Sequence, residues 1–212
     1  MNLKVFKQTD FDEMPKRFRT QFFNSLSGFK SANLVGTKDE NGVSNLAIIS
    51  SVIHLGANPS LMGMIIRPAS VPRHTLENIL ETKFFTINHV NEKIYKQAHQ
   101  TSAKYEKEIS EFQAVGLSEE YIDDFFAPYV KASNIKIGLQ LKETITIKSN
   151  NTIMVVGEVL QVAVNEISIA SDGYIDIENS GTIAVSGLDN YHKTERISRL
   201  SYAKVDKAID EI

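Results

Sequence analysis

The sequence predicts a mainly β protein, an antiparallel barrel with helical insertions, and three observations lead to this fold class. Strand-like stretches recur along the chain, about seven or eight in all, and helices rarely separate them, so the βαβ alternation of a parallel sheet is missing. Apolar side chains keep odd positions from Ile135 to Ile147, which is typical of a long half-buried strand. Asn41 and Gly42 predict a tight hairpin turn, because these residue types readily adopt positive φ angles.

The first part of the barrel is predicted from closely spaced strands. The pattern indicates strands at 31–38, 43–51, 61–67 and 84–90, loops at 39–42 and 56–60, and a helix at 75–82. The helix is indicated by Leu76, Ile79 and Leu80, which share one face at helical spacing. One helix therefore connects two strands of the barrel.

The second part combines a polar block with a long hairpin. Residues 91–130 are predicted to be mostly helical, and charges of alternating sign within them indicate a solvated surface over the sheet. Residues 134–164 predict two long strands joined by a turn at 149–151. Shorter strand-like pieces at 173–178 and 181–187 lead into a polar C-terminal segment.

Composition limits the partners of the protein. Of 212 residues, 42% are hydrophobic and 23% are charged, so we expect one folded domain with terminal extensions. The formal net charge of -3 provides no basic field that would attract nucleic acid or a membrane surface. The sequence shows no cysteine, no signal-peptide pattern and no membrane-spanning apolar run. A cytoplasmic location is therefore expected, and redox chemistry would need a cofactor.

Sequence motifs argue against several classes of enzyme. The five histidines show no metal-ligand spacing with one another or with carboxylates, so no metal site is predicted. No GxSxG elbow is present, which argues against a hydrolase of that type. The eleven glycines form neither GxGxxG nor GxxxxGK[ST], so a phosphate group would have to be held in another way.

The stretch RPASVPRHTLENI, residues 67–79, gathers donors directly before the predicted helix. One interpretation is structural: Thr75 caps the helix, Asn78 nearly completes a capping box, and the basic side chains are solvated. The other interpretation is functional, since a helix N-terminus combines free N–H groups with the positive end of the helix dipole and suits an anion. On these residues alone both interpretations stay open.

The stretches VSNLAIISS, NPSLMGMIIRP and RHTLENILETKFFTINHV, in this order and spacing, resemble the flavin reductase-like FMN-binding split barrels. This family includes flavoredoxin-type proteins and the reductase components of two-component flavin monooxygenases. The resemblance implies an antiparallel split β-barrel of Greek-key topology, a homodimer, and FMN or FAD bound noncovalently near the subunit interface. It covers residues 31–165, which leaves an N-terminal extension at 1–30 and a C-terminal extension at 166–212.

The resemblance also implies which residues lie along the flavin ring. Asn45, Leu46, Ala47 and Ile49 would follow the isoalloxazine, with backbone N–H and C=O groups bonding its pyrimidine edge. His89 and the segment 110–112 would lie near the flavin. No catalytic side chain is implied.

A second set of residues would hold the ribityl chain and the phosphate. Ser50 and Ser51 would lie beside them, although paired serines also commonly end a strand. Arg67, His74 and Thr75 would complete the phosphate site, with the helix N-terminus directed at the anion.

The function implied first is an FMN-dependent oxidoreductase that passes a hydride from NAD(P)H to the flavin, because the flavin itself carries the redox chemistry. The alternative is an FMN-binding electron carrier without nicotinamide turnover. A heme- or ligand-binding split barrel is a third hypothesis, disfavoured because the donors at the helix start suit a phosphate better. The implied partners are a flavin, a nicotinamide cofactor, and a monooxygenase or another electron acceptor.

Overall fold

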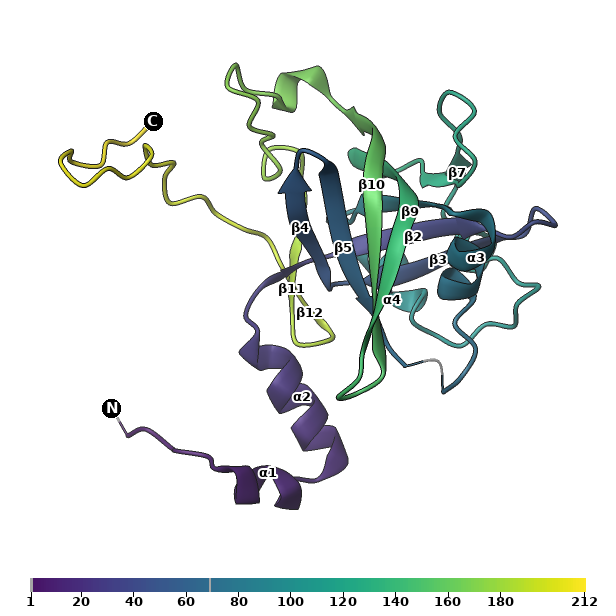
Figure 1. Ribbon diagram of the computed structural model, residues 1–212, viewed down its shortest axis with the longest axis horizontal. Helices are drawn as coiled ribbons and strands as arrows, with labels where there is room; N and C mark the ends of the chain where they lie inside the picture. Colours follow the sequence, from purple (N-terminus) through teal and green to yellow (C-terminus); the bar gives the residue numbers. More distant parts are fainter. Residues whose placement is uncertain (1, 69) are drawn as a thin grey trace.

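The barrel is built on one antiparallel sheet. The computed structural model describes residues 2–68 and 70–212, and its seven-stranded sheet has the order β3-β2-β6-β9-β10-β5-β4 (Figure 1). The strands are β2 (Asn33–Lys38), β3 (Ser44–Ile49), β4 (Val52–Ala57), β5 (Ser60–Ile66), β6 (Phe84–His89), β9 (Ile135–Ile147) and β10 (Thr152–Val164). Every pairing between them is antiparallel, which confirms the predicted mainly β split barrel with helical insertions.

Helix α3 (His74–Thr82) packs on the inner face of the sheet. Its Leu76 and Ile79 join the main buried cluster, whose strand residues are Val35, Met64, Ile66, Phe85, Ile87, Ile135, Ile137, Leu139 and Val155. The amphipathic helix predicted at 75–82 is therefore confirmed, although Leu80 is exposed rather than buried with the others. Apolar burial on one face fixes the helix against β2 and β3.

A second buried cluster lies on the outer face of β2 and β3. Leu34 and Leu46 pack there with residues of α4 (Tyr95–Gln100), α5 (Glu111–Val115), β8 (Tyr129–Val130) and β11 (Ala184–Ser186).

Strand β11 forms a small sheet with β1 (Lys30–Ser31) and β12 (Asn190–His192), and β8 pairs with β7 (Glu119–Glu120). Residues beyond 165, including Ile183 and Val185, therefore pack against the barrel. A 3₁₀ turn, η1 (Glu166–Ser168), follows β10.

Strand β9 changes face at a β-bulge. Before the bulge, odd-numbered residues such as Leu139 pack in the inner cluster, as the sequence pattern predicts. The pairing with β10 then skips one residue, Lys142. Beyond it, Thr144 lies opposite a core residue of β10, so the odd-numbered residues point to the outer face. Ile145 and Ile147 are 46% and 37% exposed, and the expectation of one buried face along the whole strand is wrong for this half.

Three predicted stretches differ from the structure. The polar block 91–130, all of it described, contains two short helices, α4 and α5, and is not mostly helical. Strand β4 forms a hairpin with β5, where the sequence prediction assigned no element to residues 52–55 and a loop to 56–60. Residues 173–178 are no strand, since they contribute only an isolated bridge between Ile169 and Ile175.

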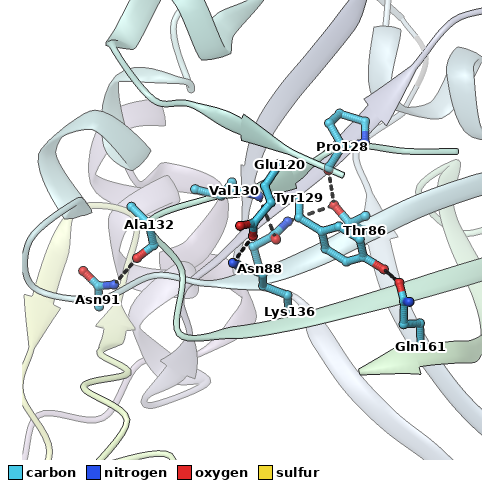
Figure 2. A network of polar contacts seen from close by, with 10 residues as sticks. All are labelled: Thr86, Asn88, Asn91, Glu120, Pro128, Tyr129, Val130, Ala132, Lys136 and Gln161. Atoms are coloured by element: carbon cyan, nitrogen blue, oxygen red, sulfur yellow. Dashed lines mark hydrogen bonds and ion pairs between the residues drawn. The ribbon is translucent and has the colours of Figure 1, made fainter. Parts of the chain in front are cut away.

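A buried polar network joins the segment 119–134 to the outer face of β6 (Figure 2). We call the hydrogen bonds of Thr86 and Asn88 to Leu34, Pro128 and Val130 the Asn88 network. The Thr86 hydroxyl donates to the Pro128 carbonyl oxygen at 2.7 Å, and Asn88 Oδ1 accepts the Val130 amide at 3.0 Å. Asn88 Nδ2 also donates to Thr86 Oγ1 at 2.9 Å. The segment lies so close to the sheet that a Cβ atom at Gly36 would be 2.3 Å from the Pro128 oxygen.

Two arms extend from the folded body (Figure 1). Helices α1 (Gln8–Glu13) and α2 (Lys16–Leu26) have no buried residue, and a polar contact between Gln21 Nε2 and Asp189 Oδ2, at 3.2 Å, links α2 to the body. At the other end, most residues after His192 are exposed. In the described part of the chain, no helix has the length and apolar character needed to cross a membrane.

Candidate functional site

Strand β3 is an edge strand, and side chains bond its outward backbone groups. The Leu46 amide donates to Glu111 Oε2 at 2.9 Å, and the Ile48 amide donates to Thr101 Oγ1 at 3.0 Å. Glu111 Oε2 also accepts a hydrogen bond from Asn45 Nδ2 at 2.7 Å. The Leu46 side chain is fully buried. The Leu46 amide is thus already bonded, which corrects the expectation that it is free for the flavin ring.

Thr75 connects α3 to β3. Its side chain is buried, and its hydroxyl donates to Asn45 Oδ1 at 2.7 Å. Thr37 Oγ1 lies 3.3 Å from the same oxygen and accepts Asn78 Nδ2 at 3.1 Å. We call Thr37, Asn45, Thr75, Asn78 and Glu111 the Asn45 network.

Both interpretations of the Thr75 hydroxyl need correction. The N-cap of α3 is Arg73, so Thr75 does not cap the helix. Because the hydroxyl proton is bonded to Asn45, it is not available to a phosphate either. Thr75 can still offer its backbone N–H, since the first amides of a helix have no partner within it.

Three basic side chains lie at or before the start of α3. Arg67 follows the end of β5 and is exposed, and it has no hydrogen-bond or ion-pair partner among residues 2–68 and 70–212. Arg73 Nε donates to the Pro68 carbonyl oxygen at 3.3 Å, which closes the loop between β5 and α3. His74 is half-buried and is the first residue of the helix. Arg67 therefore remains available to an anion, whereas Arg73 has a structural contact.

Ser51 ties the corner between β3 and β4 to strand β5. Its hydroxyl donates to the Ile65 carbonyl oxygen at 2.9 Å and accepts the Ile65 amide at 3.2 Å. This structural role matches the alternative interpretation of the serine pair and leaves the hydroxyl bonded within the protein. Ile65 precedes Arg67 by two residues, so the bond also places the corner after β3 near Arg67. Ser50 and Ala47 are half-buried.

His89 occupies the same row of the sheet as Ile49. Asn33 on β2 pairs with Ile49 on one side and with His89 on the other. Burial lowers the pKa of His89 to about 4, so its imidazole is neutral at neutral pH. His89 Nδ1 lies 3.0 Å from Thr182 Oγ1. Ile49, which is predicted to contact the flavin ring, and the neutral His89 therefore lie in one row across the sheet, with Asn33 between them.

Glu111 is a buried carboxylate that the charge of His74, the first residue of α3, influences. Burial raises the pKa of the Glu111 carboxyl, while its hydrogen bonds from Leu46 and Asn45 and the charge of His74 lower the pKa in part. The sequence resemblance placed Glu111 near the flavin but gave no sign of its bonds to β3. Thr101, which bonds the same edge, was missed because its partner lies 53 residues away in the sequence.

The antiparallel split barrel with an edge strand beside a helix N-terminus is the fold that this chain shares with flavin-related oxidoreductases. The family model described as "Flavin reductase like domain" matches residues 27–186. The chain therefore belongs to the flavin reductase-like family.

Solved structures share this fold. A candidate flavin reductase with a split barrel domain from Shewanella frigidimarina NCIMB 400 is 52% identical, with a TM-score of 0.91 over 94% of this chain and 100% of that chain. Nitrilotriacetate monooxygenase component B from Bacillus cereus is 22% identical, with a TM-score of 0.81 over 94% and 100%. Flavoredoxin of Desulfovibrio vulgaris (Miyazaki F) is 22% identical, with a TM-score of 0.69 over 85% and 93%. The last two are similar in fold.

Proposed function

We propose that the protein is an FMN-binding oxidoreductase of the flavin reductase type, which passes a hydride from NAD(P)H to the flavin. The observation that carries the proposal is the exposed Arg67 guanidinium in the loop that leads to the N-terminus of α3. The 52% identical candidate flavin reductase supports the same activity. We expect a cytoplasmic location, as the sequence indicates.

The donors at this place suit a flavin phosphate. A phosphate monoester carries a charge of about −1.5 to −2 at neutral pH. Arg67 offers a planar guanidinium, and the first turn of α3 offers backbone N–H groups and the positive end of its dipole. His74 lies in the same turn. FAD would use the same donors through its own phosphates.

The flavin ring would lie along the second half of β3. Ala47 and Ile49 are half-buried there, and Ser50 follows them at the corner that Ser51 fixes. His89 shares the row of Ile49 and would meet the ring as a neutral imidazole. We assign no general acid or base, because a bound flavin supplies the hydride-accepting chemistry and the protein positions it.

The phosphate site is tested with Arg67→Ala. A hydrogen bond to a charged group contributes roughly 1.5–3 kcal/mol, so FMN should bind about 10- to 100-fold more weakly, with riboflavin affinity unchanged. Fluorescence titration with both ligands measures this, and Arg17→Ala on the exposed helix α2 is the matched control. Equal losses for FMN and riboflavin would contradict a phosphate contact by Arg67.

The turnover test separates the reductase from an electron carrier. Wild-type protein with NADH or NADPH should sustain oxidation of the nicotinamide while free FMN is present as acceptor. A carrier would show no sustained turnover, and that result would favour the alternative function. Purified monooxygenase components would then identify an acceptor partner.

We also propose a homodimer through the outer sheet face, the apolar surface of β4, β5, β9 and β10. Its residues are Ile53, Leu55, Ile65, Ile145, Ile147 and Met154. Ser51 bonds the backbone of Ile65, so this surface adjoins the flavin site. Exposed apolar patches of this kind commonly mark an interface.

Ile145→Lys should shift sedimentation equilibrium toward monomer, whereas Thr144→Lys, on the opposite face of β9, should not. A wild-type monomer at micromolar concentration would contradict the proposal.

A further inference from the structure

We propose that Glu111 is a positioning residue of the flavin site, which holds the edge of β3 and, through Asn45, the first turn of α3. The inference rests on the proposed function, because β3 and α3 are the elements assigned to the flavin ring and phosphate. Glu111 acts through its neighbours and need not touch the flavin itself.

The contacts of Glu111 converge on one oxygen atom. Glu111 Oε2 accepts the Leu46 amide at 2.9 Å and Asn45 Nδ2 at 2.7 Å. The first bond fixes the backbone of β3 from its open edge, where no strand formed by residues 2–68 or 70–212 pairs with it. The second bond fixes the side chain of Asn45, which is buried between α5 and α3.

The bond to Asn45 sets the direction of the whole Asn45 network. An ionised carboxylate only accepts hydrogen bonds, whereas an asparagine amide has one donating and one accepting end. With Nδ2 held by Glu111, Asn45 Oδ1 faces α3 and accepts the Thr75 hydroxyl at 2.7 Å. Thr75 is the second residue of α3, so the chain of bonds ends in the turn that would offer its amides to the phosphate.

The geometry predicts that an acceptor atom is needed at this position rather than a negative charge. Both bonds reach the same oxygen, and the amide oxygen of glutamine can accept two hydrogen bonds. Burial disfavours the charged form and raises the pKa of the Glu111 carboxyl, while the hydrogen bonds from Leu46 and Asn45 lower the pKa in part. Glu111→Gln should therefore retain the function that Glu111→Ala loses.

The first experiment measures flavin affinity in the full-length protein. Glu111→Ala should weaken both riboflavin and FMN by about 10- to 100-fold, because the ring edge and the phosphate turn both lose their support. Glu111→Gln should stay within about threefold of wild type. Glu108→Ala, an exposed residue of the preceding loop, is the matched control. A Glu111→Ala variant with wild-type affinity, or a Glu111→Gln variant as weak as Glu111→Ala, would overturn the inference.

The second experiment needs no flavin and separates this inference from the proposed function. Amide hydrogen exchange by NMR should show that Leu46 loses protection in Glu111→Ala and regains it in Glu111→Gln. Ile48, which Thr101 holds, should keep its protection in both. Unchanged protection at Leu46 would refute the positioning role. If Glu111→Ala does not fold, Glu111→Asp, one methylene shorter, takes its place. A wild-type protein that binds no FMN would instead refute the proposed function.

Discussion

Two buried polar networks lie on different faces of the same sheet and differ in their main kind of bond, although each contains one bond of the other kind, from Asn88 to Thr86 and from the Leu46 amide to Glu111. In the Asn88 network, side chains bond backbone atoms of the segment that covers β6, as Thr86 does with the Pro128 carbonyl oxygen. In the Asn45 network, side chains bond one another, as Asn45 does with Glu111. A backbone partner is present whatever the sequence, whereas a side-chain partner requires a particular residue at both ends.

The two networks also differ in how completely they are satisfied. Asn88 bonds through both ends of its amide, to the Leu34 oxygen, Thr86 Oγ1 and the Val130 amide. In the Asn45 network, Asn78 Oδ1 is buried with no hydrogen-bond partner among the described residues. Satisfied buried networks stabilise a fold, and an unpaired buried acceptor costs stability. We therefore expect the Asn88 network to contribute to stability alone and the Asn45 network to set flavin affinity as well.

The largest effect should come from crowding the Asn88 network. In Gly36→Ala the new Cβ atom would lie 2.3 Å from the Pro128 oxygen and 2.7 Å from Thr86 Oγ1. The segment would have to leave the sheet, so we expect a loss of about 3 kcal/mol or more in the free energy of unfolding. Urea denaturation measures this loss. Gly173→Ala, at positive φ but in open space, should cost only about 1 kcal/mol. Equal losses would contradict the close contact.

A pair of asparagine substitutions tests the comparison directly. Asn88→Ala removes three hydrogen bonds and should lower the free energy of unfolding by about 2–3 kcal/mol, with flavin affinity unchanged in the folded protein. Asn45→Ala should cost a similar 2–3 kcal/mol of stability, because it removes the bonds to Thr37, Glu111 and Thr75, but it should also weaken FMN about 10-fold or more in the folded protein. Urea denaturation and flavin titration measure the two effects. The comparison would be contradicted if Asn88→Ala weakened flavin binding and Asn45→Ala left it unchanged.

The last effect is absent at neutral pH and concerns His89, the neighbour of Asn88 on the opposite face of β6. Its pKa is about 4 in the native state and about 6.5 in the unfolded chain, so only the unfolded state binds its proton between these values. Stability is therefore full above pH 6.5 and falls as the pH drops toward 4, by about 3 kcal/mol. Denaturation at several pH values measures this slope. His89→Asn should flatten it, and an unchanged slope would show that other groups cause it.

Sequence patterns correctly predicted the elements that depend on contacts between residues close together in the sequence. The hairpin turn at 39–42 and the helix at 75–82 depend on neighbouring residues, and both are present, although Gly42 has the positive φ and Asn41 does not. The segment 91–130 was predicted as mostly helical because only its polar pattern was visible. Its path depends on distant partners, such as Asn91 Nδ2, which donates to the Ala132 oxygen at 2.8 Å. Such bonds leave no periodic signal in the sequence.

The candidate site shows the same limit at the level of single atoms. The sequence gathers Arg67, His74 and Thr75 before a helix, and this grouping could be recognised. The use of the Thr75 hydroxyl could not, because its partner Asn45 lies 30 residues away on another element. The capping interpretation followed a local rule that tertiary contact overrides. Whether these residues hold a flavin stays a prediction that the titrations above can test.

The bulge at Lys142 has a consequence for how relatives of this protein can diverge. A gain or loss of one residue in a strand moves every side chain beyond that point to the other face of the sheet. Ile145 and Ile147 would therefore turn inward if the extra residue were deleted, and their neighbours would turn outward. In evolution, a single codon inserted or removed in β9 would be enough to create or erase an apolar contact surface, without any substitution of the residues that form it.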